Sequence, residues 1–280
     1  LSASELIVPL LHNNTIIGAI ILGRKIDDSI YSSKAIDGLR MLGNIVSMAI
    51  INSRSARELE KRHQLDRFLP PQIIERVLSG EDEAINLRKR TSLTVFFSDL
   101  KDFTGMSDRM DPENLAQILN EYLSEMSEIA FRFGGTLDKF IGDAVMVFFG
   151  APVGIEVAEQ ARQCVRMACE MQRHLESLNK KWLDRGFLYR ELSCRIGIHT
   201  GDAIVGSFGS QFRVDYTAIG SSVNLASRLE GACRPGKILV SRQTRNLLGE
   251  EFNIMPIGWV TLKGFSNPVE AFEIDPASKV

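Results

Sequence analysis

Two aspartates stand where apolar strands are expected to end. Asp99 follows the apolar run 93–97, and Asp143 lies at a Gly-Asp corner between the apolar runs 136–141 and 144–149. A carboxylate in such a place is costly to bury unless it binds a partner. If the strands are neighbours in one sheet, the carboxylates meet, and such a pair suits Mg²⁺ whose remaining ligands are substrate phosphates. The alternative is that Asp99 caps its turn and Asp143 belongs to an ordinary tight turn.

The chemistry that such a metal pair supports is phosphoryl transfer. Two ions can activate a hydroxyl group and stabilise a leaving phosphate during an in-line displacement. The backbone amides of residues 100–104, which include Phe103 and Thr104, follow Asp99 in the turn after the strand and could cradle a phosphate. This turn is therefore a candidate substrate-binding segment.

A third group of candidates lies on a helix expected over residues 221–233. Asn224 and Arg228 are four residues apart and so share one face of that helix. The apolar neighbours that would face the core are Val223, Leu225, Ala226 and Leu229. A guanidinium presented with an amide suits a phosphoryl group and a ribose. An exposed helix face that makes surface ion pairs is the alternative.

Alternating strand and helix patterns must position these residues. The periodicity predicts helices over 112–133, 153–183 and 221–233 and a short helix from Arg242. Strands are expected over 93–97, 136–141, 144–149, 192–199, 203–209, 213–218, 237–240, 252–262 and 269–274. This order indicates an α+β fold in which helices cover a mixed sheet.

A different pattern precedes residue 90. Residues 5–24 read as two apolar strands joined by a turn at 12–14, and a long helix is expected from about Ser33. Its seam has the 3.5-residue spacing of a two-helix supercoil and runs through Gly38, Leu42, Ile45, Ala49, Asn52, Ala56, Leu59 and His63. A single amphipathic helix packed on its own domain is the alternative. The prolines at 70–71 should break the helix before a short one over 72–78, and the polar segment 80–90 marks a domain boundary.

Composition excludes several classes of protein. The 280 residues are 44% hydrophobic and 24% charged, which is typical of a globular chain, and 33 Lys and Arg against 35 Asp and Glu leave a net charge of −2. No broad cationic field is available for nucleic acid or an anionic membrane. The longest apolar run, 16–22, is far shorter than the roughly 20 residues of a membrane span.

Four scattered cysteines favour buried thiols in a reducing compartment, so we expect a cytoplasmic protein. Because the chain begins with Leu1 rather than Met, we also expect it to be a fragment of a longer one.

Four ordered segments carry a resemblance to a known family. They read FFSDLKDFT, DKFIGDAVMVFFG, RIGIHTGDAIVGSFG and DYTAIGSSVNLASRLE. Together they resemble the catalytic domain of class III nucleotidyl cyclases over roughly residues 90 to 275. The resemblance implies a ferredoxin-like, palm-type domain with a mainly antiparallel sheet. It also implies that Asp99 and Asp143 bind two Mg²⁺ or Mn²⁺ ions per site.

The same resemblance assigns roles to further residues. Asn224 and Arg228 match the catalytic residues that orient the ribose and stabilise the pentavalent α-phosphate. Arg195, in RIGIHTG, and Lys263, in TLKG, resemble contacts of the triphosphate.

Lys139 and Thr217 match the two positions that read the purine base. Lys139 can only donate a hydrogen bond, which suits N1 of adenine, while the hydroxyl or carbonyl of Thr217 can accept one from the 6-amino group. This points to ATP, whereas a guanylyl cyclase is expected to have glutamate with cysteine or serine here. Threonine in place of aspartate resembles a subgroup of bacterial and bicarbonate-responsive cyclases that share the Lys and Thr pair.

The resemblance further implies a homodimer with two interfacial sites. One chain would supply Asp99 and Asp143, and the other would supply the base-reading and catalytic side chains. The ribose 3′-hydroxyl would attack the α-phosphate of ATP and release pyrophosphate. The alternatives are a guanylyl cyclase and a catalytically silent nucleotide-binding regulatory dimer. A diguanylate cyclase should instead show a Gly-Gly-Asp/Glu-Glu-Phe hairpin, where this chain reads Ile-Gly-Asp-Ala-Val.

The predicted domain organisation has three parts. Residues 1–52 resemble the C-terminal part of a GAF sensor domain, residues 53–90 form a helical stem with a transducing element, and residues 91–275 form the cyclase domain. Residues 1–163 contain no cysteine, so a bilin could not be attached covalently in this leader.

Overall fold

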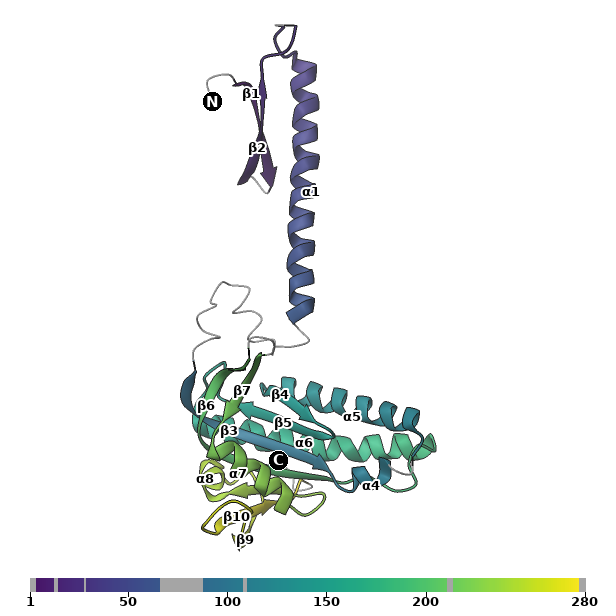
Figure 1. Ribbon diagram of the computed structural model, residues 1–280, viewed down its shortest axis with the longest axis vertical. Helices are drawn as coiled ribbons and strands as arrows, with labels where there is room; N and C mark the ends of the chain where they lie inside the picture. Colours follow the sequence, from purple (N-terminus) through teal and green to yellow (C-terminus); the bar gives the residue numbers. More distant parts are fainter. Residues whose placement is uncertain are drawn as a thin grey trace. The chain divides into compact units, whose positions relative to one another are not determined.

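The computed structural model describes residues 4–12, 15–27, 29–65, 88–107, 110–210 and 214–276. The chain divides into two compact units, Leu1–Phe68 and Leu69–Val280, each taken by itself below (Figure 1). The predicted break at residues 70–71 and the short helix over 72–78 lie outside the described residues.

The first unit is a hairpin packed on a long helix. Strands β1 (Ser4–His12) and β2 (Thr15–Gly23) pair antiparallel, and α1 (Ser33–Leu65) packs against β1. The close approach depends on Gly43, where a Cβ atom would lie 3.2 Å from Cγ1 of Val8. The predicted hairpin and helix are therefore confirmed. Leu42 and Ile45 of the predicted seam are exposed, and the supercoil and the GAF-like identity stay predictions.

The second unit is built on a mixed eight-stranded sheet. Its strand order is β4-β5-β3-β6-β8-β10-β9, and β7 also pairs with β6. The pairings are antiparallel except for that of β6 with β8, as the predicted mainly antiparallel α+β fold requires. The strands are β3 (Lys89–Leu100), β4 (Thr136–Ile141), β5 (Ala144–Phe149), β6 (Cys194–Gly209), β7 (Val214–Ile219), β8 (Ile238–Ser241), β9 (Ile254–Val260) and β10 (Val269–Ile274).

Helices cover both faces of this sheet (Figure 1). The helices are α4 (Phe103–Ser107), α5 (Pro112–Arg132), α6 (Val157–Asp184), α7 (Ser221–Ala232) and α8 (Arg242–Leu247). Successive side chains of a strand point to opposite faces. Phe96 accordingly packs in the core beneath α5 and α6, whereas Val95 and Phe97 belong to the core beneath α7.

Four elements were not predicted or differ from the predicted bounds by more than two residues. The strands expected over 192–199 and 203–209 are one continuous strand, β6, because β3 pairs with it without interruption from Cys194 to Val205. Helix α6 begins at Val157 rather than at 153, since the Glu156 side chain accepts hydrogen bonds from the first amides of the helix. The short helix α4 was not predicted. Strand β3 begins at Lys89, so the polar linker predicted to reach residue 90 ends before it.

Two expectations about the chain as a whole can be compared with the structure. The four cysteines carry free thiols and are buried, as predicted. Among the helices of the described residues, none is both long enough and apolar enough to cross a membrane.

Candidate active site

The two predicted metal-binding aspartates meet at one end of the sheet. Strands β3 and β5 are neighbours, and Ser98 pairs with Val145. Asp99, which follows Ser98, and Asp143, two residues before Val145, therefore come close together. The amide of Leu100 donates a hydrogen bond of 3.0 Å to Oδ2 of Asp143. Burial and then the charge of Asp99 raise the pKa of Asp143 to about 6. The two carboxylates therefore share one electrostatic environment.

A tight turn presents Asp143. Ile141 pairs with Ala144, so only Gly142 and Asp143 connect β4 to β5. Gly142 has a φ of 68°, the positive value that a two-residue hairpin turn requires at its first central position and that glycine adopts without strain. The turn holds the Asp143 carboxylate beside the end of β3.

Arg195 and Glu230 complete this cluster. Arg195 pairs with Asp99 in the β3–β6 ladder, and its guanidinium donates to the Asp99 carboxylate. It also lies 3.2 Å from Oε1 of Glu230, on α7. Burial raises the pKa of Glu230 to about 7, with Arg195 opposing the shift and the two aspartates adding to it. Here Arg195 contacts carboxylates, and its predicted contact with a triphosphate stays a prediction.

The donor set fits a divalent cation. Two carboxylates that repel each other are stabilised by a positive ion between them, and the pKa of Asp143 is raised by its burial and then by the charge of Asp99. Among the described residues no cluster of three or more His, Cys, Asp or Glu side chains could hold a metal. Two protein carboxylates with other positions left to water and substrate phosphate are the ligand set that Mg²⁺ commonly uses.

The predicted base-reading residues also lie together, through a residue that sequence reasoning did not identify. The side chain of Asp138 is fully buried between them. Its Oδ2 accepts a hydrogen bond of 2.5 Å from the Thr217 hydroxyl, and its Oδ1 lies 3.3 Å from Nζ of Lys139. Burial raises the pKa of Asp138, whereas the donors Thr217 and Ala218 and the charge of Lys139 oppose that shift.

Helix α7 presents the predicted catalytic residues. Asn224 and Arg228 are exposed and share a face of the helix, as the spacing predicts, and within the described part of the chain the side chain of neither makes a hydrogen bond or ion pair. A Cβ atom at Gly197 of β6 would lie 2.0 Å from the backbone nitrogen of Glu230. The absence of a side chain at Gly197 therefore allows α7 to lie directly on β6.

Lys263 lies in the turn after β9 and is exposed. The preceding Leu262 packs in one apolar cluster with Leu225 and Leu229 of α7. This packing brings the Lys263 turn to the side of the sheet that carries Arg228.

The turn before α4 is the remaining predicted segment. The Phe103 side chain is 8% exposed and packs in the core, which leaves its backbone amide for the predicted phosphate contact. The Thr104 side chain lies outside the described part of the structure. Asp102 has a φ of 60°, a left-handed conformation that is uncommon for a residue other than glycine and often occurs at functional sites.

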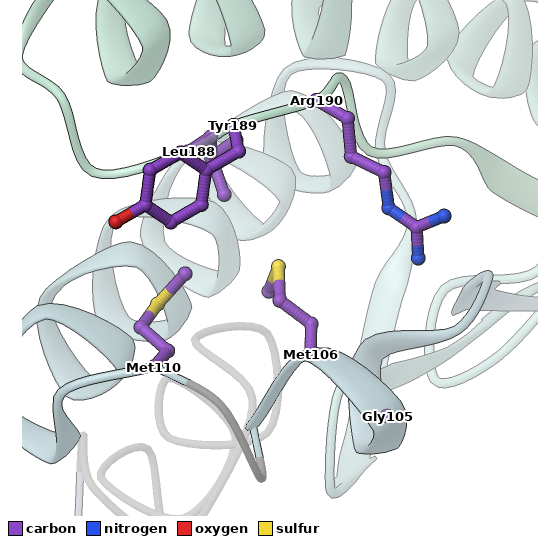
Figure 2. Close-up of a pocket in the computed structure, with 6 residues that line it drawn as sticks. All are labelled: Gly105, Met106, Met110, Leu188, Tyr189 and Arg190. Atoms are coloured by element: carbon purple, nitrogen blue, oxygen red, sulfur yellow. The ribbon is translucent and has the colours of Figure 1, made fainter.

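A pocket of about 390 Å³ borders α4 (Figure 2). Methionine side chains and the Tyr189 ring line it, and Arg190 stands at one side with its guanidinium 3.8 Å from the Asp102 carboxylate. The described lining residues are Gly105, Met106, Met110, Leu188, Tyr189 and Arg190, a set that does not include the predicted metal ligands.

The carboxylate pair and the base-reading pair are connected to opposite ends of β6. Asp99 pairs with Arg195 near the beginning of β6, whereas Thr217 pairs with Gly206 near its end. The strand between them is extended and unbroken.

Comparison with known proteins shows the family. The family model described as "Adenylate and Guanylate cyclase catalytic domain" matches residues 85–275. Adenylate cyclase 1 of Rhizobium meliloti is 29% identical over 82% of this chain and 34% of its own length. The terminal-differentiation specific adenylate cyclase of Dictyostelium discoideum is 36% identical over 65% of this chain and 8% of its own length. This chain thus spans about a third or less of these two relatives.

Solved structures agree with this assignment. The crystal structure of the adenylyl cyclase CyaB from P. aeruginosa has 44% identity and a TM-score of 0.66, covering 67% of this chain and 95% of that one. The crystal structure of the guanylyl cyclase Cya2 has 33% identity and a TM-score of 0.62, covering 67% of this chain and 93% of that one. The similar proteins thus include enzymes named for either nucleotide. The chain itself belongs to the family of adenylate and guanylate cyclase catalytic domains.

Proposed function

We propose that this protein is an adenylyl cyclase that converts ATP to 3′,5′-cyclic AMP and pyrophosphate. The observation that carries the choice of ATP is the proximity of Lys139 and Thr217 across Asp138. An ammonium group can only donate, and adenine offers N1 as an acceptor, whereas guanine carries a proton at N1. The Lys139 and Thr217 pair resembles the base-reading residues of the subgroup of bacterial and bicarbonate-responsive cyclases.

Asp99 and Asp143 would hold the divalent metal ions. Bound Mg²⁺ or Mn²⁺ would supply two effects, a lower pKa for the ribose 3′-hydroxyl and neutralisation of charge on the phosphates. Two ions per site is the number that the family resemblance implies.

The chain's own residues orient and neutralise the reacting groups. Asn224 orients the ribose, and Arg228 stabilises the extra negative charge of the pentavalent α-phosphate. Arg195 and Lys263 contact the triphosphate. The 3′-oxygen forms a bond to the α-phosphorus, the bond to the bridging α,β-oxygen breaks, and pyrophosphate leaves with that electron pair while the hydroxyl proton is released.

The site would form between two copies of the chain. One protomer would supply the carboxylate pair, and its partner would supply the base-reading and α7 residues. Exposed apolar side chains near the base-reading residues support such an interface, and they belong to β4, β6 and β7: Phe140, Ile141, Ile204, Val214 and Ile219. Buried against a second copy, they would stabilise a homodimer.

Regulation would come from the residues before the catalytic domain. We infer that residues 1–52 are the end of a GAF-like sensor and that the following helix joins its partner as a coiled-coil stem. The exposed Leu42 and Ile45 of α1 are available for that contact. The buried free thiols favour the reducing cytoplasm as the location.

A product assay tests the proposal. Purified protein is incubated with Mg²⁺ or Mn²⁺ and with ATP or GTP, and cyclic nucleotides are separated by chromatography. We expect cyclic AMP from ATP and much less cyclic GMP from GTP. Cyclic GMP as the main product would favour the guanylyl cyclase alternative, and no product from either nucleotide would favour the silent regulatory dimer. Cyclic AMP formation that survives Asp143→Ala would contradict the metal assignment.

A further inference from the structure

Asp138 is a buried carboxylate whose contacts the proposed reaction does not explain. Its side chain has no exposed surface, and it lies between the two side chains assigned to the purine base. Burying a carboxylate is expensive unless donors surround it. A threonine hydroxyl, a backbone amide and a lysine ammonium are the groups found there.

These contacts fix the direction of one hydrogen bond. Oδ2 of Asp138 accepts from the Thr217 hydroxyl at 2.5 Å and from the Ala218 amide at 3.4 Å, while Lys139 faces Oδ1 at 3.3 Å. The two hydrogen-bond donors at Oδ2 and the positive charge of Lys139 beside Oδ1 oppose the rise that burial causes in the pKa of Asp138, and they favour the ionised carboxylate, which can only accept. The Thr217 hydroxyl must therefore point its hydrogen at Asp138.

A hydroxyl that already donates its hydrogen has only lone pairs left. Towards the substrate, the Thr217 oxygen can then accept from the 6-amino group of adenine but cannot donate to O6 of guanine. With guanine, two acceptors would face each other. The charge of Asp138 also polarises the hydroxyl, so that its oxygen becomes a stronger acceptor than an isolated threonine would offer.

We propose that Asp138 is a specificity-determining positioning residue, which makes Thr217 an obligate hydrogen-bond acceptor and holds Lys139 as the adjacent donor, so that the pocket selects adenine over guanine. This inference rests on the proposed function, since it assumes that the nucleotide base binds at these residues. It also explains how threonine can stand at a position where many adenylyl cyclases are expected to have aspartate: the carboxylate lies one residue before Lys139, behind the hydroxyl.

The first test replaces the carboxylate with its amide. In Asp138→Asn the side-chain NH₂ group can turn towards Thr217, which frees the threonine hydrogen to donate to guanine. We expect the ratio of kcat/KM for ATP to that for GTP to fall about tenfold, the effect of one misdirected hydrogen bond, with KM changing more than kcat. An unchanged ratio in a folded variant would overturn the proposal.

Glu273→Gln is the matched control. Glu273 is also a buried carboxylate, on β10, and it pairs with Arg234 away from the base-reading residues. A general loss of packing or stability would lower the activity of both variants, whereas only Asp138→Asn should change the ATP to GTP ratio. The same change of ratio in Glu273→Gln would also contradict a specific role for Asp138.

A substrate analogue supplies a second test that does not require the Asp138 variant to fold. Purine riboside triphosphate retains N1 but lacks the 6-amino group, so it removes only the contact with Thr217. The unmodified protein should use ATP about tenfold better than this analogue. Thr217→Val should lose that preference, and Thr217→Ser, which keeps a hydroxyl, should restore it. If Thr217→Val still used ATP about tenfold better than the analogue, as the unmodified protein should, the proposal would be refuted.

The outcomes separate this inference from the proposed function. Unmodified protein that prefers GTP, or makes no cyclic nucleotide, would contradict the proposed function itself. Unmodified protein that prefers ATP, together with an Asp138→Asn variant of the same preference, would contradict only the role of Asp138.

Discussion

Asp138 and Asp143 belong to one hairpin, but their surroundings suit them to different roles. Asp138, on β4, is buried, which raises its pKa, but one of its oxygens accepts hydrogen bonds from Thr217 and Ala218, which oppose that rise. Asp143, five residues later at the turn, faces another carboxylate, and its pKa is raised to about 6. The first environment suits a fixed structural charge. The second suits a site that binds a cation.

The raised pKa of Asp143 predicts a stability effect with a definite sign. In the unfolded chain an aspartate has a pKa near 3.8, whereas in the metal-free fold that of Asp143 is about 6. The folded protein therefore binds a proton at Asp143 more tightly than the unfolded chain does. The contribution of this proton to the free energy of unfolding is lost as pH rises through about 6. Asp143→Asn should stabilise the metal-free protein at pH 7.5 by about 1 kcal/mol, a value reduced for partial exposure to solvent, while it abolishes cyclase activity.

Thermal unfolding in EDTA measures this effect. The gap in melting temperature between the variant and the unmodified protein should narrow as pH falls from 7.5 to 5. Added Mg²⁺ should raise the melting temperature of the unmodified protein and not that of Asp143→Asn. A variant less stable than the unmodified protein at pH 7.5 in EDTA would contradict the raised pKa, because it would show that the ionised Asp143 side chain does not destabilise the metal-free fold.

At the scale of elements, the position of α7 depends on a single glycine. A Cβ atom at Gly197 would lie 2.0 Å from the Glu230 nitrogen and 2.4 Å from the Ala226 carbonyl oxygen, so the helix would have to move away from β6. The same helix carries Asn224 and Arg228. Contact between the helix and the strand therefore sets where these side chains stand.

Gly197→Ala should reduce stability and activity together. We expect a loss of about 1–3 kcal/mol in the free energy of unfolding, the usual cost of overpacking, and a fall in kcat of at least about tenfold as Arg228 is displaced. Gly231→Ala is the control in the same helix, because a Cβ atom there would meet no atom within 4 Å. Urea unfolding and the product assay measure both variants. Full activity in Gly197→Ala would show that α7 can move without effect on the site.

The elements that the sequence predicts well are those with local signals. The hairpin of β4 and β5 follows from the apolar runs on either side of Gly142 and Asp143, and α5 follows from helical periodicity. The division predicted within β6 was wrong because residues 200–202 (Thr-Gly-Asp) resemble a turn. In the fold, Thr200 instead lies in the β3–β6 ladder, with its hydroxyl 2.9 Å from that of Thr94. That pairing partner is distant in sequence.

The same limit applies to the site. Asp99 and Asp143 could be predicted because each follows an apolar run. Asp138 and Glu230 could not, since Asp138 is buried only when Thr217 packs against it, and Glu230 is buried only when its own helix, α7, packs on β6 beside Arg195. An acidic residue beside a predicted site residue, as Asp138 is beside Lys139, is the only local signal that could have pointed to it.

At the scale of the whole molecule, an interfacial site predicts that two inactive variants recover cyclase activity when they form a heterodimer. Asp143→Ala removes the metal site of one chain, and Arg228→Ala removes the catalytic arginine that the other chain would supply. In a heterodimer of the two, one site carries both changes and the other carries neither. Random pairing makes half of the dimers mixed, so the co-expressed variants should recover about a quarter of normal activity.

The product assay on co-purified, differently tagged chains measures this recovery. A double variant, Asp143→Ala with Arg228→Ala in one chain, mixed with unchanged protein is the control for subunit exchange. No recovery in a preparation that contains mixed dimers would place all of the catalytic residues of a site on one chain.

The continuity of β6 has a consequence for evolution. Arg195 lies near the beginning of β6, and Gly206, the partner of Thr217, lies near its end. Continuous strand pairing from residue 194 to 205 fixes the number of residues between them. Because strand side chains alternate, an insertion of one residue at 200–202 would turn every later side chain of β6 to the opposite face. A true turn would tolerate such a change. Descendants of this sequence should therefore keep the length of this stretch fixed even where its residues change.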